Sequence, residues 1–176
     1  FDLGWGNTVA YLRHQRELAA GLEGSLTLAT SRYGSDTEAE ILATPVAIKN
    51  DLTDLSATAA LDWRTGAHRV RAGLTGVSYD LSYLQRFNYD IAVDYGTRPY
   101  ELAAYLDDRW LLTGSTTVRG GLRGRYLSDG ERWLLEPRLT VAQDLAENLR
   151  LRAGFGLYYQ YLQLVTTEGF SAGDFY

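Results

Sequence analysis

The feature that most constrains this chain is a strict alternation of residue types near its C-terminal end. Between residues 149 and 161 every odd position is apolar or aromatic, whereas Arg150 and Arg152 open the even positions. A period of two places successive side chains on opposite faces of a β-strand. The segment therefore predicts a strand with one apolar face and one arginine-bearing face, and these two faces need different surroundings.

The same alternation recurs along the whole chain and predicts eight strands. Short polar connections alternate with long polar segments at 34–51 and 80–99, and another long segment follows the last strand. The exception is a tight turn at 127–132. Outer-membrane barrels have short periplasmic turns and longer extracellular loops, so the pattern predicts an antiparallel transmembrane β-barrel. The predicted strands are 7–14, 22–31, 52–63, 68–79, 100–108, 115–126, 133–142 and 149–161.

Arginine decides which face of the predicted strands meets lipid. Each arginine in hydrocarbon costs roughly 2–4 kcal/mol near the bilayer midplane, and the sum over eight of them exceeds a typical domain stability of about 5–15 kcal/mol. The charged faces must therefore point into the barrel. The eight arginines on these faces are Arg69, Arg71, Arg119, Arg123, Arg125, Arg138, Arg150 and Arg152.

Carboxylates share this inward face, and we expect them to pair with arginines on neighbouring strands. They are Asp54, Asp62, Glu101, Asp107 and Glu136. On the last three strands arginine dominates, which predicts a locally positive wall that faces the lumen. Such a wall would attract an anionic ligand or bind acidic residues of a plug, and a filled lumen favours the plug. The predicted wall consists of Arg119, Arg123, Arg125, Glu136, Arg138, Arg150 and Arg152.

A soluble β-sandwich with one buried face is the alternative fold, because alternation also describes sandwiches. The apolar faces are built from Leu, Ala, Val and Gly, which are small for a packed core and usual on a lipid-facing surface. Aromatic residues near the ends of the predicted strands also favour a membrane barrel with aromatic girdles. These residues are Trp63, Tyr79, Trp110, Tyr126, Trp133 and Tyr159.

Composition excludes several classes of protein. The chain has no cysteine, which rules out disulfides and thiolate metal sites. Its formal net charge of −5 argues against nucleic acid as a partner. No stretch approaches the roughly 18 apolar residues of a membrane helix, whereas a barrel strand crosses a bilayer with about 9–11 residues.

The sequence predicts no catalytic, cofactor or metal site. His14 and His68 lie in different predicted strands, and no nucleophile stands beside a base, so we do not expect an enzyme. Ligand contacts are expected from the long segment at 80–99, which combines aromatic and charged residues as recognition surfaces do. The alternative is that these side chains cap the barrel rim among themselves. They are Tyr83, Arg86, Phe87, Tyr89, Asp90 and Tyr95.

Several short stretches, in their order and spacing, resemble the barrel of the TonB-dependent outer-membrane receptors. The resemblance is greatest to the group with a carboxypeptidase-regulatory-like N-terminal domain, and it covers nearly the whole chain. The stretches are Trp5-Gly6-Asn7-Thr8, Leu12-Arg13, Ser31-Arg32-Tyr33, Glu101, residues 105–110, Gly121-Leu122-Arg123, Glu136-Pro137-Arg138-Leu139 and residues 151–161.

The resemblance implies a plugged barrel of about 22 strands in the outer membrane. It also implies energised uptake of a scarce ligand, such as an iron chelate, an oligosaccharide, a peptide or a cobalamin-like molecule. The expected partners are the lipid bilayer, the plug domain and remaining barrel strands, the ligand, and TonB through an N-terminal part that this sequence lacks.

The chain departs from the complete family pattern in size. It has eight predicted strands, no plug sequence, no energy-coupling box and no initiating methionine. We therefore expect residues 1–176 to be one partial barrel domain from the middle of a receptor. The alternative is a small, self-closed eight-stranded barrel with a structural or adhesive role, which requires its first and last strands to pair.

Overall fold

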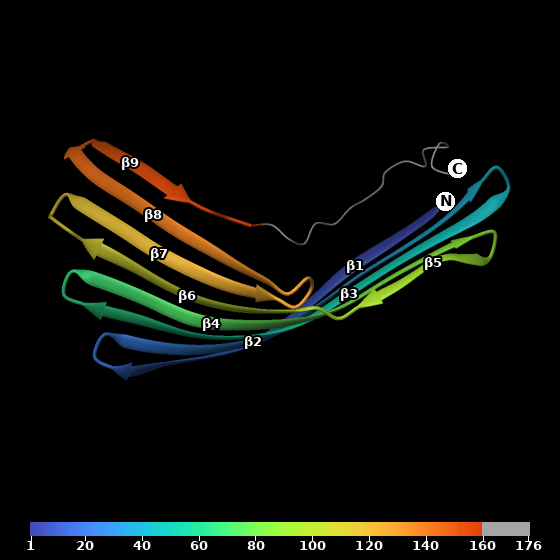
Figure 1. Ribbon diagram of the computed structural model, residues 1–176, viewed down its shortest axis with the longest axis horizontal. Coiled ribbons are helices and arrows are strands. Elements are labelled where there is room, and N and C mark those ends of the chain that lie inside the picture. Colours follow the sequence, from blue (N-terminus) through green and yellow to red (C-terminus); the bar gives the residue numbers. More distant parts are fainter. Residues whose placement is uncertain (160–176) are drawn as a thin grey trace.

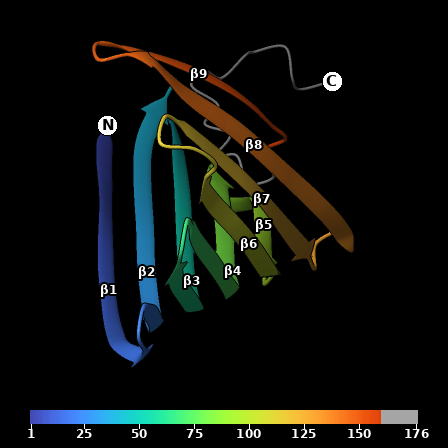
Figure 2. The same cartoon turned by 90° about the vertical axis from the view of Figure 1, so that its left-hand side faces the viewer.

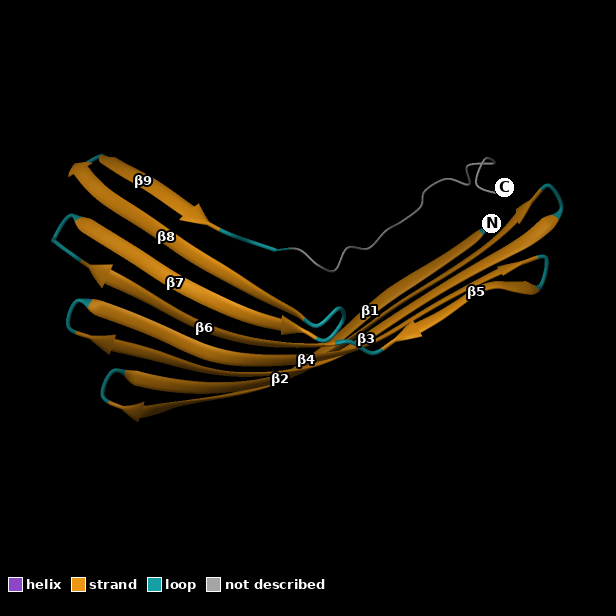
Figure 3. Ribbon diagram, viewed as in Figure 1, coloured by secondary structure: helices purple, strands orange, loops and turns teal. Residues whose placement is uncertain are grey.

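The computed structural model describes residues 1–159, which form a single curved antiparallel sheet (Figures 1 and 3). Its strands follow the order β1-β2-β3-β4-β6-β7-β8-β9, and β5 pairs with β4 beside this path. The described residues include no helix that could cross a membrane. The strands are β1 (Asp2–Ala19), β2 (Leu22–Ile41), β3 (Thr44–Thr65), β4 (His68–Phe87), β5 (Asp90–Thr97), β6 (Tyr100–Leu111), β7 (Thr116–Leu127), β8 (Arg132–Ala146) and β9 (Leu149–Gly156).

The register aligns the alternating patterns of neighbouring strands, so that the whole sheet has two unlike faces. A slip of one residue would move every side chain of a strand to the other face. We call the side that carries Leu74 the outer face and the side that carries Arg71 the inner face. One row of directly opposed residues on the outer face consists of Leu26, Ala59, Leu74, Ala104, Gly124 and Leu135.

Aliphatic side chains on the outer face are exposed. Leu74 at the centre of the sheet is 64% exposed, and Leu106 is 57% exposed. Among the described residues only three apolar side chains are buried, namely Val46, Ala103 and Leu127. A β-sandwich would bury its apolar face, whereas this face requires an apolar partner such as lipid.

The two long polar segments are strands, which corrects the prediction that they are loops. Residues 34–51 continue the β2–β3 hairpin, which turns at Leu42 and Ala43, and residues 80–99 contain the β4–β5 turn and all of β5. The period of two persists there with polar residues on one face. The turn residues Leu42 and Ala43 have φ of 50° and 62°, a conformation that Asn or Gly usually adopts. Because Leu and Ala occupy these positions, the sequence carried no turn signal there.

Strand β4 changes partner along its length. Residues 68–78 pair with β6, whereas residues 81–87 pair with β5. The change occurs at Pro99, which has no N–H to donate and whose carbonyl accepts a hydrogen bond from the Tyr79 amide at 2.9 Å. Beyond this point the β2–β3 and β4–β5 hairpins project past the ends of β6–β9 (Figure 1).

The sheet is open over the described residues. Strand β1 pairs only with β2, and β9 pairs only with β8 (Figure 2). Residues 1–159 therefore do not form the self-closed small barrel considered above. Strand β9 ends at Gly156, before the predicted limit at residue 161, and residues 160 and 161 lie outside the described part. The tight turn at 127–132 is confirmed, with Gly130 at φ 72°.

A substitution on each face of β4 tests the assignment of the faces. In the full-length protein folded into lipid vesicles, we expect Leu74→Arg to lower the free energy of unfolding by about 2–4 kcal/mol, because the arginine enters hydrocarbon. The neighbouring control Thr75→Arg faces inward and loses mainly the 3.2 Å hydrogen bond to Thr58, worth about 0.5–1.5 kcal/mol. Equal costs in a denaturant titration would contradict the assignment.

Candidate functional site

Ion pairs between strands cover the inner face. Arg69 donates three hydrogen bonds to the Asp62 carboxylate, at 2.7, 3.0 and 3.1 Å. Asp107 on β6 lies between two arginines, with Arg119 on β7 at 2.8 Å and Arg71 on β4 at 3.6 Å. The alternation places all five side chains on one face. In the register, Arg71 lies directly opposite Asp62 and Asp107, whereas Arg69 and Arg119 reach these acids diagonally. The predicted cross-strand pairing is therefore present.

Two glutamates at the centre of this network are buried. Glu101 is 4% exposed and Glu136 is 1% exposed, and Arg125 lies between them with Nε at 3.6 and 3.2 Å from their carboxylates. Arg138 adds a contact of 2.9 Å to Glu136, and Arg123 lies 3.5 Å from Glu101. Buried charges need such partners, because removing one leaves the other uncompensated.

The structure places the seven residues of the predicted wall on the inner face. Arg150 pairs with Asp144 at the β8–β9 turn. Arg152 lies opposite Ala142, which assigns it to the same face. The prediction placed Glu101 and Asp107 of β6 on this face but did not count them in the wall, and their carboxylates neutralise part of its positive charge. A role for the wall in binding remains a prediction.

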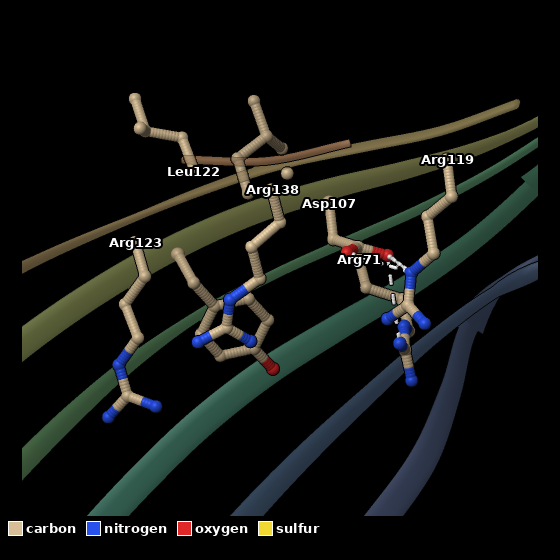
Figure 4. A pocket seen from close by; sticks show the side chains of 9 residues that line it. Arg71, Asp107, Arg119, Leu122, Arg123 and Arg138 are labelled. Carbon is tan, nitrogen blue, oxygen red and sulfur yellow. Dashed lines mark hydrogen bonds and ion pairs between the residues drawn. The ribbon is translucent and has the colours of Figure 1, made fainter. Parts of the chain in front are cut away.

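A hollow of about 240 Å³ lies in this network, over Gly121. Figure 4 shows the four guanidinium groups and Asp107 on one side of the sheet, with Leu122 on the other side. We call it the Gly121 hollow. Its charged lining consists of Arg71, Asp107, Arg119, Arg123 and Arg138.

The projecting hairpins reverse the polarity of the two faces. On their outer side are ion pairs, including Lys49–Asp36 at 2.7 Å and Arg98–Asp80 at 3.0 Å. The inner face of the sheet carries the charges nearer β6–β9, but on the projecting hairpins it bears mostly apolar and aromatic residues, with Asn50 bonded to Ser35 among them. The reversal marks one end of the apolar part of the outer face, which we call the apolar band. Inner-face residues of these hairpins include Tyr33, Val46, Ile48, Leu52, Leu81, Tyr83, Phe87, Val93 and Tyr95.

The six predicted ligand-contact residues lie in different places: on the inner face, on the outer face and at the β4–β5 turn. Tyr83, Phe87 and Tyr95 lie on the inner face, and Arg86 lies on the opposite face of β4. Tyr89 occupies the hairpin turn with φ of 68°. Asp90 begins β5, opposite Phe87. Their contact with a ligand remains a prediction.

Sequence reasoning missed the contribution of β1 to the same inner face. Leu3, Trp5 and Tyr11 share this face, and Trp5 is 74% exposed. The signal was present in the sequence, because odd positions from 3 to 11 are mostly apolar or aromatic. The prediction began the strand at residue 7 and so omitted Leu3 and Trp5.

Most predicted girdle residues lie at the two ends of the apolar band. Tyr126 packs between Tyr100 and Trp133, with ring centroids 6.0 and 5.0 Å apart. At the other end His68 stacks on Trp110. Trp63 also lies on the outer face at that end, opposite Val70.

Two of the predicted girdle residues lie elsewhere. Tyr79 lies on the inner face opposite Asp54, because it occupies an odd position of β4. Tyr159 follows the end of β9 and is in no strand.

The comparisons with known proteins concern the fold. No protein-family model and no curated protein sequence matches the chain. Among solved structures, the ferric yersiniabactin uptake receptor FyuA from Yersinia pestis matches with a TM-score of 0.70 at 13% identity. The ferric preacinetobactin receptor BauA from Acinetobacter baumannii matches with a TM-score of 0.65 at 12% identity, and the copper transporter OprC matches with a TM-score of 0.63 at 18% identity.

These matches cover most of this chain but a minor part of each receptor. The match to FyuA covers 86% of this chain and 28% of FyuA. For BauA the two shares are 86% and 30%, and for OprC they are 85% and 29%. The chain therefore has the fold of a barrel segment of TonB-dependent outer-membrane receptors, which confirms the predicted fold class. The sequence identities are low, so the similarity concerns the fold alone.

Removing one buried glutamate tests the energetic importance of the network. We expect Glu136→Ala to destabilise the full-length protein by about 3–5 kcal/mol, because Arg125 and Arg138 lose a shared buried partner. The matched control is Glu147→Ala in the β8–β9 turn, where a change within about 0.5 kcal/mol is expected. Similar denaturation midpoints for the two variants would contradict the proposed importance.

The Asp144–Arg150 pair predicts a local dependence on pH. Its hydrogen bonds from Arg150 hold the pKa of the Asp144 carboxyl below the ordinary value of 3.8. Because this pKa is lowered on folding, the pair stabilises the fold above that ordinary value and loses the contribution as the pH falls through the folded pKa. We expect Asp144→Asn to reduce the acid sensitivity of unfolding, with Asp129→Asn as the control that leaves it unchanged.

Proposed function

We propose that this chain is a wall segment of an outer-membrane receptor that takes up a scarce ligand with energy from TonB. The observation that carries this proposal is the polarity of the sheet, whose outer face is exposed and apolar over one band and charged above it. This order suits a wall that passes from lipid into water. The similarity of fold to FyuA, BauA and OprC supports the same reading.

The apolar inner face of the projecting hairpins is the proposed ligand-contact surface. Tyr83 and Tyr95 are directly opposed on β4 and β5, and the Tyr83 hydroxyl donates to Gln85 at 3.1 Å. Trp5 exposes its ring on β1. Rings with a polar edge are enriched at recognition surfaces because they combine large contact area with hydrogen bonding. Such a surface suits a ligand that is partly apolar and partly polar.

The names of the structural neighbours suggest the ligand class to test first. FyuA is named for ferric yersiniabactin, BauA for ferric preacinetobactin and OprC for copper. We propose a metal ion held by an organic chelator, with an oligosaccharide or a peptide as the alternatives. All three neighbours are named as receptors or transporters, and we propose no catalytic activity for this chain.

The charged lower part of the inner face suits a lumen filled by polar protein. Bare lipid on this face would desolvate Asp62, Asp107 and their arginines. We propose a plug domain as the filling, contributed by a part of the receptor outside this chain, through which TonB acts.

Deleting the gene for the full-length protein tests the proposed function. We expect outer-membrane fractions to contain the protein as a band that shifts on heating. We also expect deletion to abolish uptake of one member of a panel of radiolabelled iron chelates. A protein absent from the outer membrane, or uptake that deletion leaves unchanged across chelates, oligosaccharides and peptides, would contradict it.

A pair of neighbouring substitutions tests the ligand-contact surface. We expect Tyr95→Ala to weaken binding of the transported ligand about tenfold, the effect of losing roughly 1.4 kcal/mol of contact energy. The control Asp94→Ala lies on the other face, opposite Leu84, and should leave the affinity unchanged. Titration of the purified receptor provides the measurement, and equal effects would place the ligand elsewhere.

A further inference from the structure

The Gly121 hollow concentrates positive charge on the inner face. Four arginines from β4, β7 and β8 line it, and Asp107 is its one carboxylate. Asp107 already accepts two hydrogen bonds from Arg119 Nε, at 2.8 and 3.0 Å. Arg109 adds a further guanidinium beside the hollow, because it lies directly opposite Arg119 in the register. The lining thus carries more positive than negative charge.

The other acids near these arginines do not line the hollow, including Asp62, which lies opposite Arg71. Arg138 contacts Glu136 at 2.9 Å and Arg123 contacts Glu101 at 3.5 Å, and neither glutamate lines the hollow. The Nε of Arg123 is shielded from solvent and meets no hydrogen-bond acceptor within residues 1–159. A buried donor of this kind normally has a partner.

The hollow depends on the absence of a side chain at residue 121. A Cβ added there would lie 2.8 Å from Asp107 Oδ2. Gly120, its neighbour on the outer face, has open space around the corresponding position. Any larger residue at 121 would therefore displace the Asp107 carboxylate that Arg71 and Arg119 hold.

We propose that the Gly121 hollow binds one carboxylate group. Guanidinium forks match a planar carboxylate, and hydrogen bonds between charged partners are the stronger ones. The negative charge of Asp107 favours a singly charged group over a doubly charged phosphate. The volume of about 240 Å³ admits the end of one acidic side chain or one small free acid. The inference rests on the proposed function, since it takes the inner face as the lining of a lumen.

Photo-crosslinking tests a carboxylate that belongs to a polypeptide in the lumen. The full-length receptor would carry a benzophenone amino acid in place of Tyr105, which lines the hollow, or in place of Leu102, an outward-facing control that does not line it. We expect Tyr105, and not Leu102, to cross-link to a segment of the same protein that contains Asp or Glu, identified by mass spectrometry.

Acetate tests a free carboxylate as the source. At constant ionic strength, replacing chloride by acetate should raise the apparent Tm of the full-length receptor in detergent. Gly121→Asp, which supplies its own carboxylate, should abolish this shift, and Gly120→Ala should retain it. A cross-link together with no acetate shift assigns the site to a polypeptide, and the converse assigns it to a free acid.

The proposal is overturned when acetate produces no specific shift and Tyr105 cross-links to no segment that carries Asp or Glu. Heat-shifted migration and outer-membrane location of the unmodified receptor report on the proposed function separately. Absence of both binding signals in a correctly inserted receptor therefore removes the carboxylate site and leaves the receptor proposal intact.

Discussion

The cost of placing charge in hydrocarbon governs this structure. Strands β3, β4, β6 and β7 alternate apolar with polar or charged residues across the band, and their register without slips keeps the arginines of the band on one side of the sheet. Because lipid cannot solvate a guanidinium, the two faces are not interchangeable. Backbone pairing supplies no preference between them, so the orientation of the sheet is set by its side chains.

The charged side chains excluded from the outer face lie on the inner face, where they need oppositely charged partners. They pair across strand boundaries, as Arg125 does between Glu101 and Glu136. These contacts connect β6, β7 and β8 by side chains as well as by backbone hydrogen bonds. Their value lies in specifying the register, since a shift of one residue along β7 would bring Arg125 to the outer face.

Sequence alone was sufficient for the two-faced strands and for the assignment of the arginines, because both follow from a period of two and a known solvation cost. It failed at the projecting hairpins, where turn residues such as Leu42 and Ala43 carry no turn signal. It also misplaced Tyr79, whose position near a strand end suggested a girdle although its odd number assigns it to the inner face.

The Gly121 hollow and the burial of Glu136 could not be predicted from sequence. Both depend on which residues of different strands meet, and the diagonal contact between Arg119 and Asp107 follows only once the β6–β7 register is fixed. A glycine in a strand also has several explanations. Only the surrounding arginines distinguish this one.

The change of partner along β4 separates two tasks within one strand. Below Pro99, β4 pairs with β3 on one side and with β6 on the other, and its outer face is apolar. Above Pro99, β4 pairs with β3 and with β5, and β5 has no other partner in the described chain. Insertions or deletions near residues 88–89 can thus lengthen or shorten the projecting β4–β5 hairpin in steps of two residues, while the register between β4 and β6 is unchanged. The proposed ligand-contact surface can therefore change in length without altering the strand pairing of the apolar band.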